Sequence, residues 1–227
     1  MKKMKVTALV LCGALLLGSG STISNMNNTT KGGIIGGGGG AAAGAIIGGL
    51  IGKGKGAAIG AAIGAAVGTG TGVVIGKKMD KKAAEAAQIE GAQVQMVQDT
   101  NGLDAVKVTF DSNILFGFNS ATLSNDAKAS LRELARILKE DTTTDIAIIG
   151  HTDKVGTYEA NVKVSKNRAN SVENYLESCG VSPAQFKQVA GVAYDQYDET
   201  KSAAENRRVD IYMYASAAMI QQAQQGY

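Results

Sequence analysis

The sequence predicts an α/β (α+β) sandwich of the order βαβαβ-β in the second half of the 227-residue chain. Short stretches in which apolar and polar residues alternate indicate half-buried strands. Longer stretches between them carry apolar residues three and four positions apart, as amphipathic helices do. These stretches occupy about 115 residues, which is enough for one hydrophobic core.

The predicted elements follow one another at short intervals. The first strand is marked by Val106, Val108 and Phe110, and Ser124 is placed to cap the first helix. Gly180 ends the second helix. In chain order the elements are a strand at 106–110, a helix from Ser124 to Leu138, a strand at 145–150, a helix at 158–178, a strand at 186–192 and a strand at 209–213.

The first 31 residues have the composition of a secretory signal followed by a spacer. Three lysines precede an apolar run at 6–17, and small residues follow it, so 1–21 is expected to be a signal peptide. Residues 22–31 are rich in Ser, Asn and Thr and predict a flexible spacer. Cys12 lies in the middle of the apolar run, so lipidation there is not expected. Removal of the signal leaves Cys179 as the only thiol and excludes an internal disulfide.

A glycine recurs at every fourth position from Gly32 to Gly76. Small residues at this spacing allow helices to pack backbone to backbone, as in membranes. The lysines at 53 and 55 divide the stretch into two apolar halves. We therefore expect 32–76 to form a membrane-associated helical hairpin, with a soluble or self-associating helical stalk as the alternative.

Residues 77–100 predict a solvated helical linker, because lysine pairs at its start are followed by Ala, Gln and Glu. The basic start would suit anionic lipid headgroups, or would simply be a solvated face. A linker of this kind would keep the zipper apart from a globular domain at 103–215, so that a chain beginning near Val94 would fold on its own. Residues 216–227 are expected to be a tail.

The distribution of charge excludes nucleic-acid binding as the main function. Residues 1–76 hold six lysines and no acidic residue, whereas 77–227 hold 17 basic and 20 acidic residues. The part that can fold is therefore mildly acidic, and a nucleic-acid-binding domain would carry the basic surface itself.

The most informative candidate site joins a loop to a helix face. The loop Gly150-His-Thr-Asp153-Lys-Val-Gly156 follows a predicted strand, and Asn161, Ser165 and Arg168 share one face of the next helix. Asp153 could hold an ammonium group, and Arg168 could bind a carboxylate with two hydrogen bonds. The alternative is that Asp153 and Arg168 simply pair with each other.

Three motifs in this region resemble the OmpA-like peptidoglycan-binding domain over roughly 108–214. They are Gly150-His-Thr-Asp153-x-x-Gly156, then Asn161-x-x-Val164-Ser165-x-x-Arg168-Ala169, then Asn206-Arg207-Arg208-Val209-Asp210-Ile211. Val164 stands where the family usually has Leu, and Phe118-Asn119 stands where Phe-Asp is more common. The repeated glycines resemble the glycine-zipper segments of bacterial outer-membrane lipoproteins.

The resemblance implies non-covalent binding of peptidoglycan through meso-diaminopimelate of the stem peptide, at the periplasmic face of the outer membrane. The ligand residues of the family correspond to Asp153 and Arg168. Further candidates for the pocket wall are Thr152, Asn161, Phe118, Asn119 and Arg207. The implied partners are peptidoglycan and outer-membrane lipid, and no cofactor is expected.

Two other classes of function fit the sequence less well. His151-x-Asp153 could be half of a metal site, but such sites need three or four protein ligands and this chain has a single histidine. A nucleophile elbow G-x-S-x-G before a helix is also missing, so an enzyme is not expected. The other alternative is a membrane-active or pore-forming zipper protein that the wall-binding domain only localises.

Overall fold

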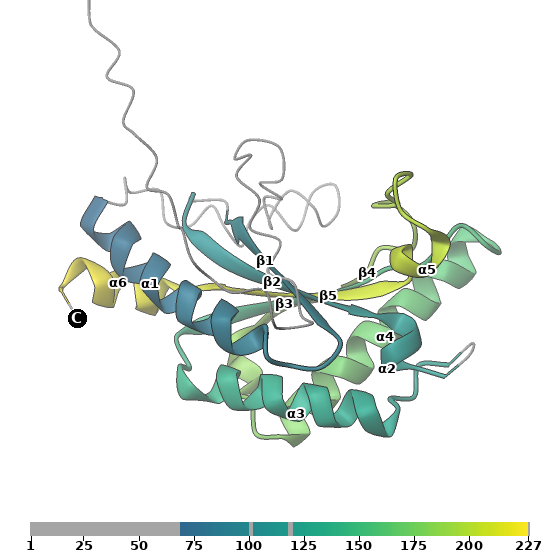
Figure 1. Ribbon diagram of the computed structural model, residues 1–227, viewed down its shortest axis with the longest axis horizontal. Coiled ribbons are helices and arrows are strands. Elements are labelled where there is room, and N and C mark those ends of the chain that lie inside the picture. The colour runs from purple at the N-terminus through teal and green to yellow at the C-terminus, as the bar shows by residue number, and fades with distance from the viewer. Residues whose placement is uncertain (1–68, 100–101, 118–119, 227) are drawn as a thin grey trace, which may run out of the picture.

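The computed structural model describes residues 69–99, 102–117 and 120–226 (Figure 1). A single five-stranded sheet has the strand order β1-β2-β5-β3-β4. Its strands are β1 (Ala92–Gln98), β2 (Asp104–Asp111), β3 (Thr144–Gly150), β4 (Phe186–Gly191) and β5 (Arg208–Ala215). Only β3 and β4 pair in parallel, and every other neighbouring pair is antiparallel.

The helices differ greatly in length, and the longest, α4, carries Asn161 and Arg168 of the candidate site. They are α1 (Thr69–Ala86), α2 (Ser112–Leu115), α3 (Asn125–Glu140), α4 (Tyr158–Ser178), the 3₁₀ helix η2 (Pro183–Gln185), α5 (Ala203–Asn206) and α6 (Ala217–Gln224). The predicted βαβαβ-β order is confirmed, because the six expected elements are β2, α3, β3, α4, β4 and β5.

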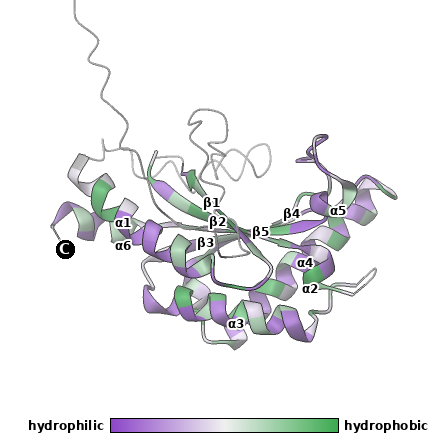
Figure 2. Cartoon of the chain, in the orientation of Figure 1, coloured by the Kyte–Doolittle hydropathy of each residue, from purple (hydrophilic) through white to green (hydrophobic). Residues whose placement is uncertain are grey.

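The main core lies between the sheet and the helices on one of its faces. Alternate strand residues such as Val108, Ile148 and Ile211 are fully buried there, together with apolar residues of α1, α3, α4 and α6. Hydrophobic and hydrophilic residues alternate around α3 (Figure 2), whose Leu131 and Leu134 are fully buried. The strand residues that point to the opposite face, such as Tyr212, form a second and smaller cluster.

The prediction of a helical linker at 77–100 is wrong. Helix α1 begins inside the glycine repeat and ends at Ala86, and β1 pairs along its whole length with β2, from Ala92 opposite Phe110 to Gln98 opposite Asp104. Ile75 and Met79 of α1 are fully buried in the core. Two residues four positions apart form an apolar stripe, which folding buries against the sheet.

The domain therefore begins before residue 103, and the last part of the zipper, residues 69–76, belongs to α1. Gly76, the last glycine of the repeat, lies so close to β2 that an added Cβ would be 2.9 Å from the carboxylate of Asp104. A chain that begins at Val94 would lack α1 and the first two residues of β1. We therefore expect such a chain to lose part of the core and one edge of the sheet.

The expected tail at 216–227 is also part of the fold. Ser216 caps α6 by accepting a hydrogen bond from the Met219 N–H at 3.2 Å. Met219 and Ile220 are buried in the core that α6 shares with α1. Capping and apolar spacing together make this short C-terminal stretch helical.

The two ends of the sheet carry different features. Helix α6 and the start of α1 lie at the end where Thr144 pairs with Ala215 (Figure 1). The loop after β3 and helix α2 lie at the other end, where Gly150 pairs with Val209. The signal peptide, the spacer and the zipper up to residue 68 fall outside the described residues. Within the described ranges, no helix is long and apolar enough to span a bilayer.

Candidate functional site

A cavity of about 460 Å³ opens at the end of the sheet opposite the start of α1. It lies between α2 with the residues that follow it, the loop after β3, and the first half of α4. Its walls are formed by Ser112, Asn113, Phe116, Gly117, Thr152, Asp153, Val155, Ala160, Asn161, Val164, Arg168 and Arg207. The volume is within the roughly 300–1,000 Å³ usual for ligand pockets.

Two glycines allow α4 to lie directly on the sheet beside this cavity. A Cβ at Gly150 of β3 would be 2.1 Å from the carbonyl oxygen of Ser165, and a Cβ at Gly191 of β4 would be 2.1 Å from the backbone nitrogen of Lys166. The hydroxyl of Ser165 accepts a hydrogen bond from the Ala193 N–H at 3.1 Å. Position and rotation of α4 are therefore fixed by backbone contact, and with them the place of Arg168.

The loop after β3 is shaped by the side chains of two predicted site residues. Asp153 Oδ1 accepts a hydrogen bond from the Val155 N–H at 3.0 Å. Asn161 Nδ2 donates to the carbonyls of Val155 at 2.9 Å and Thr157 at 3.1 Å. Asn161 thus acts mainly as a positioning residue, since its amide hydrogens already bind the loop.

Asp153 pairs with Arg207 and not with Arg168. Arg207 Nη1 lies 2.6 Å from Asp153 Oδ2. Arg168 donates through Nε to the carbonyl of Ser120 at 3.1 Å, and its guanidinium lies over the ring of Phe116, 5.3 Å from the centroid. The predicted alternative of a simple Asp153–Arg168 pair is therefore not formed.

The site carries an excess of positive charge that is partly shielded from water. Arg168 is only 7% exposed, and none of the described carboxylates forms an ion pair with it. Burial lowers the pKa of Arg168, and the neighbouring charge of Arg207 lowers it further, whereas Asp153 acts in the opposite direction. Two guanidinium groups and one carboxylate in one cavity favour a ligand that brings a carboxylate and an ammonium.

Of the weaker candidates, Thr152 and Arg207 both line the cavity. The hydroxyl of Thr152 is buried and has no hydrogen-bond partner among the residues that the structure describes. Phe118 and Asn119 lie outside the described residues. The sequence reasoning missed Ser112, Asn113 and Phe116, although their position directly after a strand could have indicated them.

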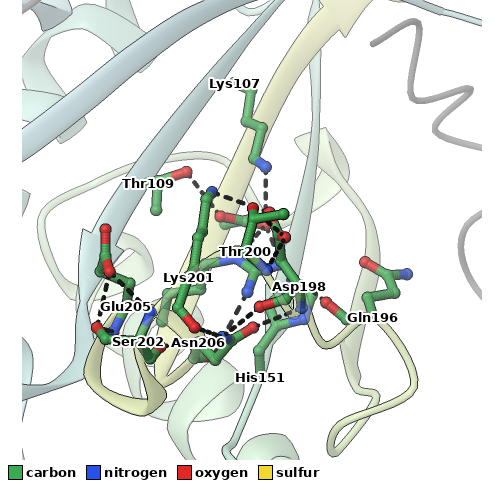
Figure 3. Close-up of polar contacts among 12 residues, drawn as sticks. Lys107, Thr109, His151, Gln196, Asp198, Thr200, Lys201, Ser202, Glu205 and Asn206 are labelled. Atoms are coloured by element: carbon green, nitrogen blue, oxygen red, sulfur yellow. Dashed lines mark hydrogen bonds and ion pairs between the residues drawn. The ribbon is translucent and has the colours of Figure 1, made fainter. Parts of the chain in front are cut away.

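Asn206 and Arg208, on either side of Arg207 in the chain, belong to a buried polar cluster (Figure 3). Its centre is the carboxylate of Asp210, which is fully buried. Lys107 Nζ, His151 Nε2 and Arg208 Nε all lie 3.1–3.2 Å from Asp210 Oδ2, and the Thr109 hydroxyl donates to Oδ1 at 2.7 Å. Burial alone would raise the pKa of Asp210, but the contact with His151 and the charges of Lys107 and Arg208 hold that pKa well below its usual range.

The same cluster explains the order Asn206-Arg207-Arg208. Asn206 is fully buried and binds the loop before it, donating to the carbonyls of Asp198 and Ser202 at 3.0 Å and accepting from the Asp198 N–H at 2.8 Å (Figure 3). With that loop fixed, Arg207 reaches Asp153 in the cavity, whereas Arg208 reaches Asp210.

His151 belongs to this buried cluster and not to a metal site with Asp153. Its ring is 1% exposed and faces Asp210, whereas Asp153 binds Arg207 in the cavity. Burial lowers the pKa of His151, against the opposing influence of Asp210. The described part of the chain contains no group of three or more side chains suited to hold a metal ion.

Comparison with known proteins finds a matching family for each of the two parts of the chain. Residues 115–210 match the OmpA family, and residues 1–80 match the YMGG-like Gly-zipper. Both resemblances that the sequence predicts are thereby confirmed: the chain carries an OmpA-family domain behind a glycine zipper.

Curated relatives match about half of the chain. Outer membrane protein A of Bordetella avium is 32% identical over 115 residues, which are 49% of this chain and 59% of the relative. The peptidoglycan-associated lipoprotein of Buchnera aphidicola is 33% identical over 106 residues, which are 47% of this chain and 58% of the relative. The chain thus spans less than two thirds of the length of these relatives.

Among solved structures, a putative MotB-like protein from Desulfovibrio vulgaris has the same fold. It aligns with a TM-score of 0.52 at 21% identity, over 64% of this chain and 92% of that protein. At this identity the likeness establishes the fold alone.

Proposed function

We propose that the OmpA-family domain of this chain binds peptidoglycan non-covalently, through the meso-diaminopimelate of the stem peptide. The observation that carries the proposal is the meeting of Asp153, Arg168 and Arg207 in one cavity. The free end of diaminopimelate bears an ammonium and a carboxylate on one carbon atom. Asp153 is suited to the ammonium, and the two guanidinium groups are suited to the carboxylate.

Binding would rearrange one existing contact. Arg207 neutralises Asp153 in the empty cavity, with the Asp153 side chain 12% exposed. An incoming ammonium would take over part of that role, which frees Arg207 to face the ligand carboxylate beside Arg168. The buried Thr152 hydroxyl supplies one more hydrogen bond. Each hydrogen bond to a charged group would contribute about 1.5–3 kcal/mol.

The placement of the cavity supports a tether between the outer membrane and the cell wall. The protein lies at the outer membrane, with this domain on the periplasmic side, in agreement with the names of the relatives. The zipper enters the domain at the start of α1, and the cavity lies at the other end of the sheet (Figure 1). Peptidoglycan bound in the cavity would therefore lie at the end of the domain that is remote from the zipper and the membrane.

The proposal is tested by sedimentation with purified peptidoglycan. Asp153→Ala and Arg168→Ala should each lower the affinity for diaminopimelate-type peptidoglycan at least tenfold, since each removes a charged contact to the ligand. Arg136→Ala is the matched control, because Arg136 is an exposed arginine on α3 whose ion pairs with described residues are those with Glu133 and Glu140.

Peptidoglycan with lysine in place of diaminopimelate supplies a second comparison. Lysine lacks the carboxylate at the free end, so the intact protein should bind this material more weakly. Unchanged pelleting of both site variants while they stay folded, or equal binding of the two materials by the intact protein, would refute the diaminopimelate assignment.

A further inference from the structure

Val155 is the most exposed large hydrophobic residue in the described part of the chain. Its exposed fraction is 77%, and it nevertheless lines the cavity. Ala160, at the start of α4, is also exposed and lines the same cavity. Asp153 and Arg168 are only 8% and 7% exposed. The cavity is therefore charged at depth, and Val155 and Ala160 give part of its mouth an aliphatic surface.

Val155 is held rigidly although it is exposed. Its N–H donates to Asp153 Oδ1 at 3.0 Å, and its carbonyl accepts from Asn161 Nδ2 at 2.9 Å. Both polar groups of its backbone are thus occupied, and only the isopropyl group is left to contact a ligand. A side chain on an already ordered backbone loses less entropy on binding than one on a mobile loop.

We propose that Val155 and Ala160 form a subsite for the D-alanine that follows diaminopimelate in the stem peptide. This inference rests on the proposed function. When the free end of diaminopimelate is held at depth by Asp153 and Arg168, a short hydrocarbon chain leads back to its peptide-bonded end at the mouth. The next residue then lies beside the two aliphatic side chains. The side chain of D-alanine is a methyl group, which can contact both of them.

The test compares two dipeptides in which diaminopimelate is joined to D-alanine or to glycine. Calorimetric titration of the full chain should show about fourfold tighter binding of the D-alanine form, which corresponds to about 0.8 kcal/mol for one buried carbon group. Val155→Ser should lose most of this preference, so that its affinities for the two dipeptides become nearly equal. Val73→Ser is the matched control, because Val73 is 57% exposed on α1 and does not line the cavity.

The outcomes separate the two proposals. Equal binding of both dipeptides by the unchanged protein, or a preference that survives in Val155→Ser, would overturn the D-alanine subsite and leave the diaminopimelate site intact. If neither dipeptide binds and free diaminopimelate does not bind either, the proposed function itself is refuted, and the subsite with it.

Discussion

Replacement of Gly150 by alanine should damage both the fold and the candidate site, because this glycine is where α4 touches β3. An alanine Cβ there would lie 2.1 Å from the carbonyl oxygen of Ser165 and 2.9 Å from its carbonyl carbon. Contacts of a Cβ below 3.0 Å essentially never occur in real structures, and these neighbours are backbone atoms. Helix α4 would therefore have to move away from the sheet by about 0.9 Å.

The cost follows from that displacement. Overpacking of a close contact destabilises a protein by about 1–3 kcal/mol. Arg168 lies about one helical turn beyond Ser165 and would be carried along, out of its present place near Asp153 and Arg207. Loss of one charged hydrogen bond to the ligand, worth about 1.5–3 kcal/mol, would weaken binding of diaminopimelate about tenfold or more.

Chemical denaturation measures the first effect, and titration with diaminopimelate under conditions where the variant is folded measures the second. Gly72→Ala is the control, since a Cβ at this α1 position would have no neighbour within 4 Å. That substitution should leave binding unchanged and stabilise α1 by up to about 1 kcal/mol. If Gly150→Ala is as stable as the unchanged protein and binds as tightly, the close contact of α4 with the sheet does not set the site.

Two further predictions concern parts of the fold that support the site. Burial lowers the pKa of His151, so the unfolded chain binds a proton more readily than the folded one. Stability should therefore fall as the pH drops below about 6.5, by at most about 1.4 kcal/mol per pH unit. In His151→Asn, whose chain has no other histidine, denaturation curves between pH 7 and about pH 5 should lose this slope. An equal slope in both proteins would assign it to other groups. Met79→Ala should lower the free energy of unfolding by about 2–5 kcal/mol, because the Met79 side chain of α1 is fully buried in the core. If the free energy of unfolding hardly changes, α1 is not part of the core, and the interpretation of 77–100 as an independent helical linker would be favoured again.

Local patterns in the sequence determined most of the domain. Alternation of apolar residues placed β2 and β5, and apolar spacing with a capping serine placed α3, because both signals depend on near neighbours along the chain. The loop with Asp153 and the helix face with Asn161 and Arg168 were predicted in the same way. All three line one cavity, as the motifs suggested.

Tertiary structure decided what the patterns left open. Residues 77–100 are polar enough to resemble a linker, yet Ile75 and Met79 bind α1 to the core and β1 completes the sheet edge. The amino-acid types of these few apolar residues do not reveal whether they pack against another part of the chain. The surface that they pack against exists only once the distant strands have paired.

The partner of Asp153 was decided in the same manner. Spacing along one helix suggested Arg168, whereas the ion pair is made with Arg207, 54 positions away in the chain. The pairing of β3 with β5, which places Gly150 opposite Val209, brings the two residues together. Spacing reports which residues share the face of one element, but the contacts between elements depend on strand register and on how closely two backbones can approach.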